Sequence, residues 1–435
     1  MARFHFLFRR LQLQAMITRE TIEAKLLSNH LHGLLPPGLI APDYGSYSID
    51  SIPSFIRGLF GERIERGSVL LPFLPPNLPQ SVILLILDGM GYMHLTRLLS
   101  EFPDMFLNCL IGRGKMIPLT SVFPSTTATA LASLSTGVTP QEHGMLGYRL
   151  YLKETSAITN MISLSLLGND KSDNALEAGI DDKTFLNVTT LFEHLRRLGV
   201  DSHVLMTKHI AKSGLSRLLY DGAAKIHQMV NLSDMLVTAR EVLNREKGKT
   251  FVSLYWAATD AIAHVHSPWT DVFTAELRSI DAALERELSG RVEDTLLLIT
   301  ADHGFVPMDE ADYIDITKYP DLYGNLALPP VGDTRAAYLF VRDGRKEEVS
   351  RIIAETFSGN VTCLDAEQAL DAGLFGMGEV LRESRDRIGD LIIASTGRKT
   401  LYYPYKDSTK LRGMHAGLTP EEMLVPFVIS NLQGE

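Results

Sequence analysis

The chain has 435 residues, of which 45% are hydrophobic and 22% charged, a composition typical of folded globular proteins and unlike that of long disordered segments. Its 42 Lys and Arg against 52 Asp and Glu give a net charge of −10, which argues against binding a nucleic-acid polymer through the general surface. A local pocket can still bind a small anion, above all where metal ions supply positive charge.

The first residues, 1–16, are apolar but interrupted by arginines and glutamines. They lack the continuous hydrophobic region and the small-residue cleavage site of a signal peptide, and a weak amphipathic surface anchor is the alternative interpretation. We find no apolar run long enough to span a bilayer. The two cysteines, Cys109 and Cys363, fit no disulfide framework and are expected to be buried free thiols. A cytoplasmic protein is therefore expected.

Changes in pattern along the chain predict four blocks. Residues 1–79 are expected to form an N-terminal helical and irregular wrap, in which a helix over 17–35 ends at a Pro-Pro-Gly stretch. Residues 80–310 are expected to form the main α/β core and residues 311–400 an inserted lid. Residues 401–435 would return to the core.

Continuous apolar runs mark the strands of the core. VILLIL at 82–87 does not alternate, which is typical of a strand covered by helices on both faces. Similar runs lie at 203–206, 251–256, 295–300 and 424–430, with helical patterns at 190–198 and 232–247. This alternation predicts an α/β fold, a layered αβα arrangement with a mostly parallel central sheet. Within the lid, 336–341, 346–357 and 390–395 predict strand, helix and strand, a small α+β unit.

Acidic and imidazole side chains follow the predicted core strands. In open α/β sheets the functional crevice lies beyond the carboxyl ends of the strands, so these residues should meet at one edge. The candidates are Asp88, Asp260, His264, Asp302 and His303, together with His415 just before the last strand.

This residue set points to a metal site. Carboxylate oxygen and imidazole nitrogen suit Zn²⁺, and also manganese or iron. Asp260 and His264 are four residues apart and share a helix face, while Gly304 after Asp302-His303 allows a turn that lets both side chains reach one cluster. Any one of these residues alone would more often be a cap or a turn residue. Their joint arrangement predicts a metal site.

A nucleophile is expected in the segment SVFPSTTATA at 121–130. Hydroxyl residues at a helix start offer free backbone N–H groups that favour an anion, and a hydroxyl beside a divalent ion can attack phosphorus. A Ser/Thr-rich helix cap is the alternative. The spacing leaves the choice open among Ser125, Thr126, Thr127 and Thr129.

These motifs resemble those of the alkaline phosphatase superfamily, and most closely its type I phosphodiesterase and nucleotide pyrophosphatase branch. They occur in the family's order, and the inserted lid resembles the capping insertions of this family, including those of phosphonoacetate hydrolases. The resemblance implies an alkaline phosphatase-like fold. The matching segments are LDGMG at 87–91, FPSTTATALASLSTGVTPQEHG at 123–144, DAIAH at 260–264, TADHG at 300–304 and HAGLTPEEMLVP at 415–426.

The resemblance also implies roles for single residues. One zinc would be bound by Asp88, Thr127, Asp302 and His303, and the other by Asp260, His264 and His415. Thr127 would be the nucleophile, attacking phosphorus in line to form a phospho-threonine intermediate that water then hydrolyses. Three carboxylates and one alkoxide would offset two divalent ions, which leaves a site able to accept a phosphoryl anion.

One departure from the family pattern leaves the substrate open. The family usually has Asn three residues after the nucleophile, where this chain has Ala130. We expect a hydrolase of phosphodiester or pyrophosphate bonds in nucleotide-like or other small substrates, because no Arg stands beside Thr127 in sequence to balance a doubly charged monoester. Arg149 or Arg335 could still approach in space. The alternatives are a phosphomonoesterase, a phosphonate hydrolase or a mutase, or a non-catalytic metal-bound nucleotide sensor. The oligomeric state is left open.

Overall fold

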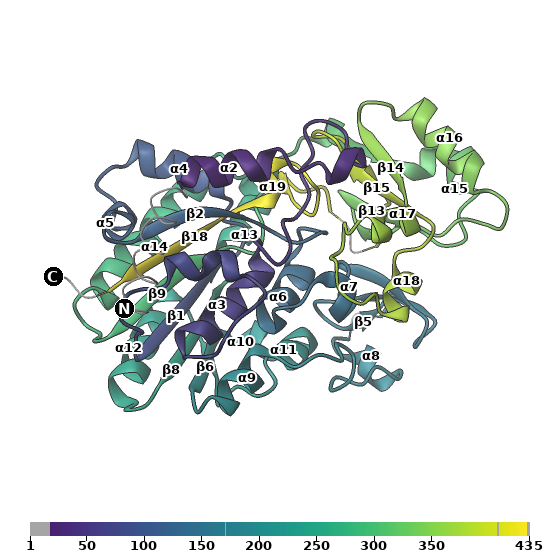
Figure 1. Ribbon diagram of the computed structural model, residues 1–435. Helices are drawn as coiled ribbons and strands as arrows, with labels where there is room; N and C mark the ends of the chain where they lie inside the picture. Colours follow the sequence, from purple (N-terminus) through teal and green to yellow (C-terminus); the bar gives the residue numbers. More distant parts are fainter. Residues whose placement is uncertain (1–17, 170, 407–408, 433–435) are drawn as a thin grey trace, which may run out of the picture.

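The computed structural model describes residues 18–169, 171–406 and 409–432, so the prediction about residues 1–16 lies outside the described part. Two sheets organise the chain (Figure 1). A large sheet with helices on both faces holds all five strands predicted for the core. A second sheet forms a smaller lobe beside it.

The large sheet has seven strands and confirms the layered α/β prediction. Five neighbours, β9, β1, β8, β6 and β7, run parallel, and β18 is antiparallel to both β9 and β2. In spatial order the strands are β2 (Lys115–Thr120), β18 (Leu424–Asn431), β9 (Thr295–Thr300), β1 (Ser81–Leu87), β8 (Thr250–Trp256), β6 (Asp201–Thr207) and β7 (Lys225–Met229). The two edge strands, β2 and β7, were not predicted, since β2 contains Pro118 and most of β7 is exposed.

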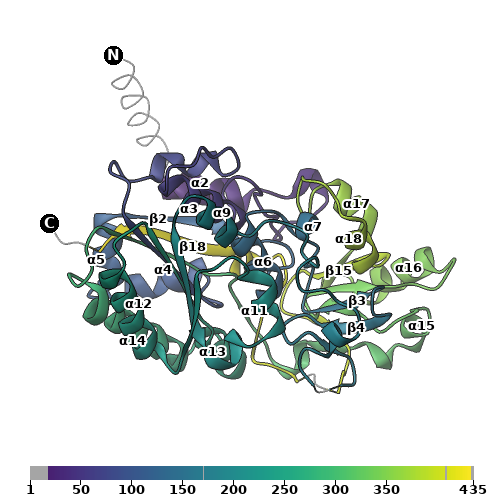
Figure 2. The same cartoon turned by 90° about the horizontal axis from the view of Figure 1, so that it is seen from below.

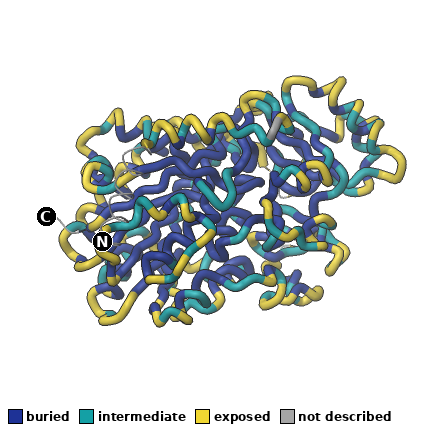
Figure 3. The backbone as a smooth tube through the Cα atoms, in the orientation of Figure 1, coloured by how far each residue is buried: buried dark blue, intermediate teal, exposed yellow. Residues whose placement is uncertain are grey.

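Burial explains why the apolar runs are continuous. Every residue of β1 and β9 is buried, because helices cover both faces of the sheet (Figure 3). Helices α3 (Ile52–Leu59) and α9 (Leu191–Arg197) lie on one face, while α12 (Leu232–Arg245) and α14 (Asp271–Leu288) lie on the other (Figure 2).

The remaining helices are short. The helix predicted over 17–35 is α2 (Arg19–Leu27), and it ends where Ser28 Oγ and Asn29 Nδ2 donate to the backbone carbonyls of Lys25 and Ala41. The other α-helices are α4 (Tyr92–Glu101), α5 (Phe106–Arg113), α6 (Thr127–Thr136), α7 (Pro140–His143), α8 (Asn174–Glu177), α10 (Lys208–Ala211), α11 (Gly214–Leu219), α13 (Ala258–His266), α15 (Pro320–Tyr323), α16 (Lys346–Thr356), α17 (Ala366–Asp371), α18 (Arg382–Arg387) and α19 (Pro420–Met423). Short 3₁₀ helices cover Leu31–Gly33, Ile49–Ser51, Ser68–Phe73, Glu310–Asp312 and Ile316–Lys318.

The second sheet is antiparallel throughout. Its order is β14 (Val361–Asp365), β15 (Leu391–Ser395), β13 (Ala336–Leu339), β12 (Val331–Asp333), β3 (Arg149–Leu152), β4 (Ala157–Asn160) and β5 (Ser165–Leu166). The predicted strand, helix and strand of the lid are β13, α16 and β15. The sheet also includes β3, β4 and β5, whose residues were predicted to belong to the core. They join it where Arg149 pairs with Gly332.

Two short strand pairs complete the structure: β10 (Val306–Pro307) with β17 (Gly413–Met414), and β11 (Tyr313–Asp315) with β16 (Thr400–Tyr402). Across the described residues, every helix is too short or too polar to cross a membrane. Cys109 and Cys363 are both free thiols, as predicted, but the expectation that both are buried was wrong. Cys109 lies on the exposed side of α5, which packs on β18 through its other face.

Candidate metal centre

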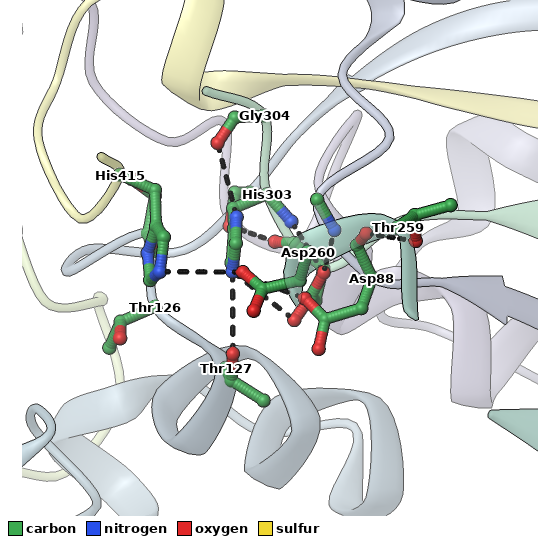
Figure 4. A network of polar contacts seen from close by, with 12 residues as sticks. Asp88, Thr126, Thr127, Thr259, Asp260, His303, Gly304 and His415 are labelled. Carbon is green, nitrogen blue, oxygen red and sulfur yellow. Dashed lines mark hydrogen bonds and ion pairs between the residues drawn. The ribbon is translucent and has the colours of Figure 1, made fainter. Parts of the chain in front are cut away.

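The sequence-predicted acids and histidines meet at the carboxyl edge of the parallel strands. Asp88 directly follows β1, and Asp302 and His303 lie just beyond the neighbouring β9. On the other side of β1, strand β8 leads into α13, which presents Asp260 and His264 one turn apart. His415 follows β17, next to α13. The topology therefore gathers all six side chains at one place, and Figure 4 shows Asp88, Asp260, His303 and His415 there.

Two overlapping groups of potential ligand atoms result. In Asp88, Asp302 and His303, one such atom from each residue lies within 4.8 Å of the others, and all three residues are buried. His303 Nε2 is 3.4 Å from Asp88 Oδ1 and 3.5 Å from Asp302 Oδ2. Asp260, His303 and His415 form the second group. His264 Nε2 is 3.3 Å from Asp260 Oδ1, so the predicted His264 also borders that group.

The three imidazoles are oriented as metal ligands. Each Nδ1 faces a backbone carbonyl: His264 that of Gly413 at 2.8 Å, His303 that of Gly304 at 3.1 Å and His415 that of Ser125 at 3.1 Å. A carbonyl oxygen only accepts, so each Nδ1 carries the proton and each Nε2 presents its lone pair to the cluster. This is the tautomer in which histidine binds a metal through Nε2.

In Asp88 and Asp302, one carboxylate oxygen accepts hydrogen bonds from the protein and the other accepts none from the described residues. Asp302 Oδ1 accepts from the backbone N–H groups of Gly89 and His303, both at 3.0 Å, and Asp88 Oδ2 accepts from the Tyr255 hydroxyl. Among the described residues, nothing donates a hydrogen bond to Asp88 Oδ1, Asp260 Oδ1 or Asp302 Oδ2, although all three atoms are buried. Buried oxygens without donors are costly, and a divalent cation is the group that satisfies them. The residues present therefore fit the expected ions.

Electrostatics agree with that fit. Burial, and next the charge of Asp302, raise the pKa of Asp88 well above its ordinary value. Burial also raises the pKa of Asp260, but the neighbouring histidines, His264 first, outweigh it and lower that pKa overall. Burial and the imidazole of His303 hold the pKa of His415 well below the usual range, which keeps it neutral. Burial lowers the pKa of His264, but the charge of Asp260 outweighs it and raises that pKa overall. The crowded buried carboxylates form a site that attracts cations.

Phe305 and Gly89 support the cluster, a role that the sequence analysis did not predict for them. The Phe305 ring meets the rings of His264, His303 and His415 edge-on, with centroids 5.0, 5.5 and 5.1 Å away. A Cβ on Gly89 would lie 2.3 Å from Phe305 Cε2, and the φ of Gly89 is +73°. Their places in the sequence could have indicated this role, because Gly89 directly follows Asp88 and Phe305 directly follows Asp302-His303-Gly304.

The structure separates the four candidate hydroxyls. Thr127 is the first residue of α6, and its Oγ1 lies 3.4 Å from His303 Nε2 (Figure 4). Ser125 Oγ donates to the carbonyl of Gly417 at 2.8 Å, Thr126 Oγ1 donates to Asp333, and Thr129 is fully buried. Thr127 is thus the one of these four for which the described residues show a hydroxyl contact with the cluster. It also stands at a helix N-terminus, where backbone N–H groups favour an anion.

A pocket of about 330 Å³ opens onto the cluster. One wall comes from the core and includes Thr127, Asp260, His264 and His415. The facing wall comes from the second sheet and the chain near residue 400, and it carries Tyr148, Arg149, Asp333, Tyr402, Tyr403 and Tyr405. The second sheet therefore closes the site opposite the cluster of carboxylates and imidazoles.

Other sequence candidates lie elsewhere. The expectation that Arg335 could approach the site was wrong, because its fully buried guanidinium pairs with Glu422 and donates to the carbonyls of Gly397 and Arg398. Ala130 is buried inside α6 and is not among the described residues that line the pocket.

Comparison with known proteins agrees with this architecture. Residues 82–418 match the family model of type I phosphodiesterase / nucleotide pyrophosphatase. Murine ectonucleotide pyrophosphatase/phosphodiesterase 5 is similar in structure, with TM-score 0.62 and 16% identity over 81% of this chain and 88% of that chain. Its inactive form has been solved in complex with AMP.

Phosphonoacetate hydrolase from Sinorhizobium meliloti 1021, solved in complex with phosphonoformate, has TM-score 0.61 and 21% identity over 81% of this chain and 90% of that chain. A search of curated proteins gave no significant match. Both structures belong to the alkaline phosphatase superfamily, as the sequence resemblance implied. The match over residues 82–418 and the shared fold show that the chain belongs to the type I phosphodiesterase / nucleotide pyrophosphatase family of that superfamily.

Proposed function

We propose that the protein hydrolyses phosphodiester or pyrophosphate bonds in nucleotide-like or other small substrates, with two divalent metal ions and Thr127 as nucleophile. One observation carries the proposal. Three buried carboxylate oxygens without hydrogen-bond donors among the described residues, and three Nε2 lone pairs, converge beside the first residue of α6. Such a donor set beside a hydroxyl at a helix N-terminus suits attack on phosphorus.

The distances favour the ligand sets that the resemblance implied. We assign Asp88, Asp302, His303 and Thr127 to one ion, and Asp260, His264 and His415 to the other. His303 also lies near Asp260 and His415, but its Nε2 is 3.4 and 3.5 Å from the first two carboxylates, and His264 is the nearer partner of Asp260. When bound, the ions supply the positive charge that stabilises a Thr127 alkoxide and the developing phosphoryl charge; zinc is expected.

In the proposed reaction, Thr127 Oγ1 loses its proton to solvent and attacks phosphorus. The bond from phosphorus to the leaving oxygen breaks on the opposite side, and that oxygen takes up a proton from solvent. The N-terminal N–H groups of α6 face the phosphoryl oxygens of the phospho-threonine that forms. Water then attacks its phosphorus, releases the phosphoryl product and restores the hydroxyl. His264, His303 and His415 keep their Nδ1 protons throughout, since each donates to a backbone carbonyl.

The pocket supports a substrate with a ring or another flat group. Five tyrosines line it, and the murine structure shows AMP bound to a protein of the same fold. A phosphonate hydrolase is the second candidate, because the phosphonoacetate hydrolase shares the fold to a similar extent and Arg149 lines the same pocket.

The test is hydrolysis of bis(p-nitrophenyl) phosphate beside p-nitrophenyl phosphate, with zinc or manganese, by the wild type and Thr127→Ala. We expect a preference for the diester and a loss of roughly a thousandfold or more in kcat for the variant. Thr129→Ala, which removes a buried hydroxyl from the same helix, is the matched control and should stay active. Full activity of Thr127→Ala would exclude it as the nucleophile, and hydrolysis of neither ester would contradict the proposed function.

A further inference from the structure

The second sheet places a carboxylate in the wall of the pocket. Asp333, the last residue of β12, lines the same cavity as Thr126, Thr127 and His415. It is separate from the six proposed metal ligands and comes from the opposite lobe. An acidic side chain in a site built to hold a phosphoryl anion is electrostatically unfavourable for that anion and so calls for an explanation.

Two hydrogen bonds hold this carboxylate next to the start of α6, where Thr127 lies. Asp333 Oδ1 accepts from Thr126 Oγ1 at 3.2 Å, and Oδ2 accepts from the backbone N–H of Tyr148 at 3.1 Å. Thr126 is the N-cap of α6 and directly precedes Thr127. Both carboxylate oxygens are therefore held by donors, one of them adjacent to the residue that would attack phosphorus.

We propose that Asp333 is a specificity-determining residue whose carboxylate disfavours phosphoryl groups with two negative charges, and so favours diesters over monoesters. The inference rests on the proposed function. A diester carries one charge on its phosphoryl group and a monoester carries two at neutral to basic pH, so a fixed negative charge in the wall repels the monoester about twice as strongly. This selection works by repulsion, and it needs no Asn at the position of Ala130.

Two neighbouring features bear on the size of the effect. Arg149 also lines the cavity, with its guanidinium over the rings of Tyr148 and Tyr405, 4.6 and 4.8 Å from their centroids, and its charge acts on Asp333 by lowering the pKa of that carboxyl. Burial raises the pKa of Asp333 to about 6, so at a pH of about 8 the side chain is ionised.

The experiment compares two substrates that share a leaving group, methyl p-nitrophenyl phosphate and p-nitrophenyl phosphate. For wild type and Asp333→Asn, kcat/KM is measured for both at a pH of about 8 with the same metal. We expect the ratio of monoester to diester kcat/KM to rise about tenfold in the variant, equivalent to about 1.4 kcal/mol. An unchanged or lower ratio would overturn the inference, because a purely structural role would lower both rates together.

Controls separate the charge from the hydrogen bonds. Asp333→Glu keeps the charge and Thr126→Ala keeps Asp333 itself, so both should retain the wild-type ratio. If Asp333→Asn does not fold, Asp333→Ser gives the same comparison. A second readout needs no turnover: inorganic phosphate should raise the Tm of the metal-loaded variant more than that of the wild type. An equal or smaller rise would count against the inference.

The two hypotheses fail in different ways. If the wild type cleaves neither ester, the proposed function is wrong. If it cleaves them through Thr127 but the ratio does not move in the Asp333 variants, only the specificity role is wrong.

Discussion

The two sheets contribute to the site in different ways. One edge of the large sheet gathers all six proposed metal ligands and the proposed nucleophile, which lie after β1 and β9, on α13 and α6, and after β17. The antiparallel sheet supplies the facing wall, with tyrosines, Arg149 and Asp333. If the proposed function holds, the chemistry takes place at the edge of the large sheet and the lobe packed against it selects the substrate.

The largest expected effect comes from breaking the parallel edge. In Asp302→Asn an amide replaces a buried carboxylate whose Oδ2 faces His303 Nε2 at 3.5 Å. We expect activity to fall roughly a thousandfold or more and the bound metal to decrease, as measured by kinetics and by elemental analysis of the purified protein. Asp343→Asn, on the exposed surface of the other lobe, should change neither. Full metal content in Asp302→Asn would remove Asp302 from the ligand set.

A smaller effect, a loss of stability and metal affinity, is expected from substituting Gly89, where an added Cβ acts on the proposed metal site through Phe305. Gly89→Ala places a Cβ 2.3 Å from Phe305 Cε2 at a φ of +73°. The free energy of unfolding should fall by about 2–4 kcal/mol, and metal affinity should fall because Phe305 packs against all three histidines. Chemical denaturation and metal titration measure the two effects. Gly397→Ala has open space around its Cβ and should cost less than about 0.5 kcal/mol. Equal stability of the two variants would refute the steric argument.

The smallest effect is expected from the facing wall. Tyr403 lines the pocket and stacks on Tyr323, with ring centroids 5.7 Å apart. For Tyr403→Ala we expect KM for thymidine 5′-(p-nitrophenyl phosphate) to rise about fivefold, because a stacking surface for the flat group is lost. Values of kcat and KM for methyl p-nitrophenyl phosphate, which lacks such a group, should change less than about twofold. A large fall in kcat for both substrates would mean that this wall takes part in the chemistry.

The parallel edge could be predicted from the amino-acid sequence alone. Buried parallel strands need continuous apolar runs, so VILLIL at 82–87 and TLLLIT at 295–300 were recognisable, and the polar residues after them had to meet at one edge. The order of the motifs along the chain also indicated the family. These signals are local, because each depends on a strand and on the few residues that follow it.

The remaining features follow from the tertiary structure, since they depend on contacts between residues far apart in the chain. Strand β5 has two residues, too few for a periodic pattern, and Arg149 pairs with Gly332 across a long separation. Likewise, the contact between Thr127 Oγ1 and His303 Nε2 distinguishes one hydroxyl among four. Arg335 forms a buried ion pair with Glu422, which lies far from it in the chain. Pairing, burial and ring packing of this kind arise when the chain is folded, and no local pattern encodes them.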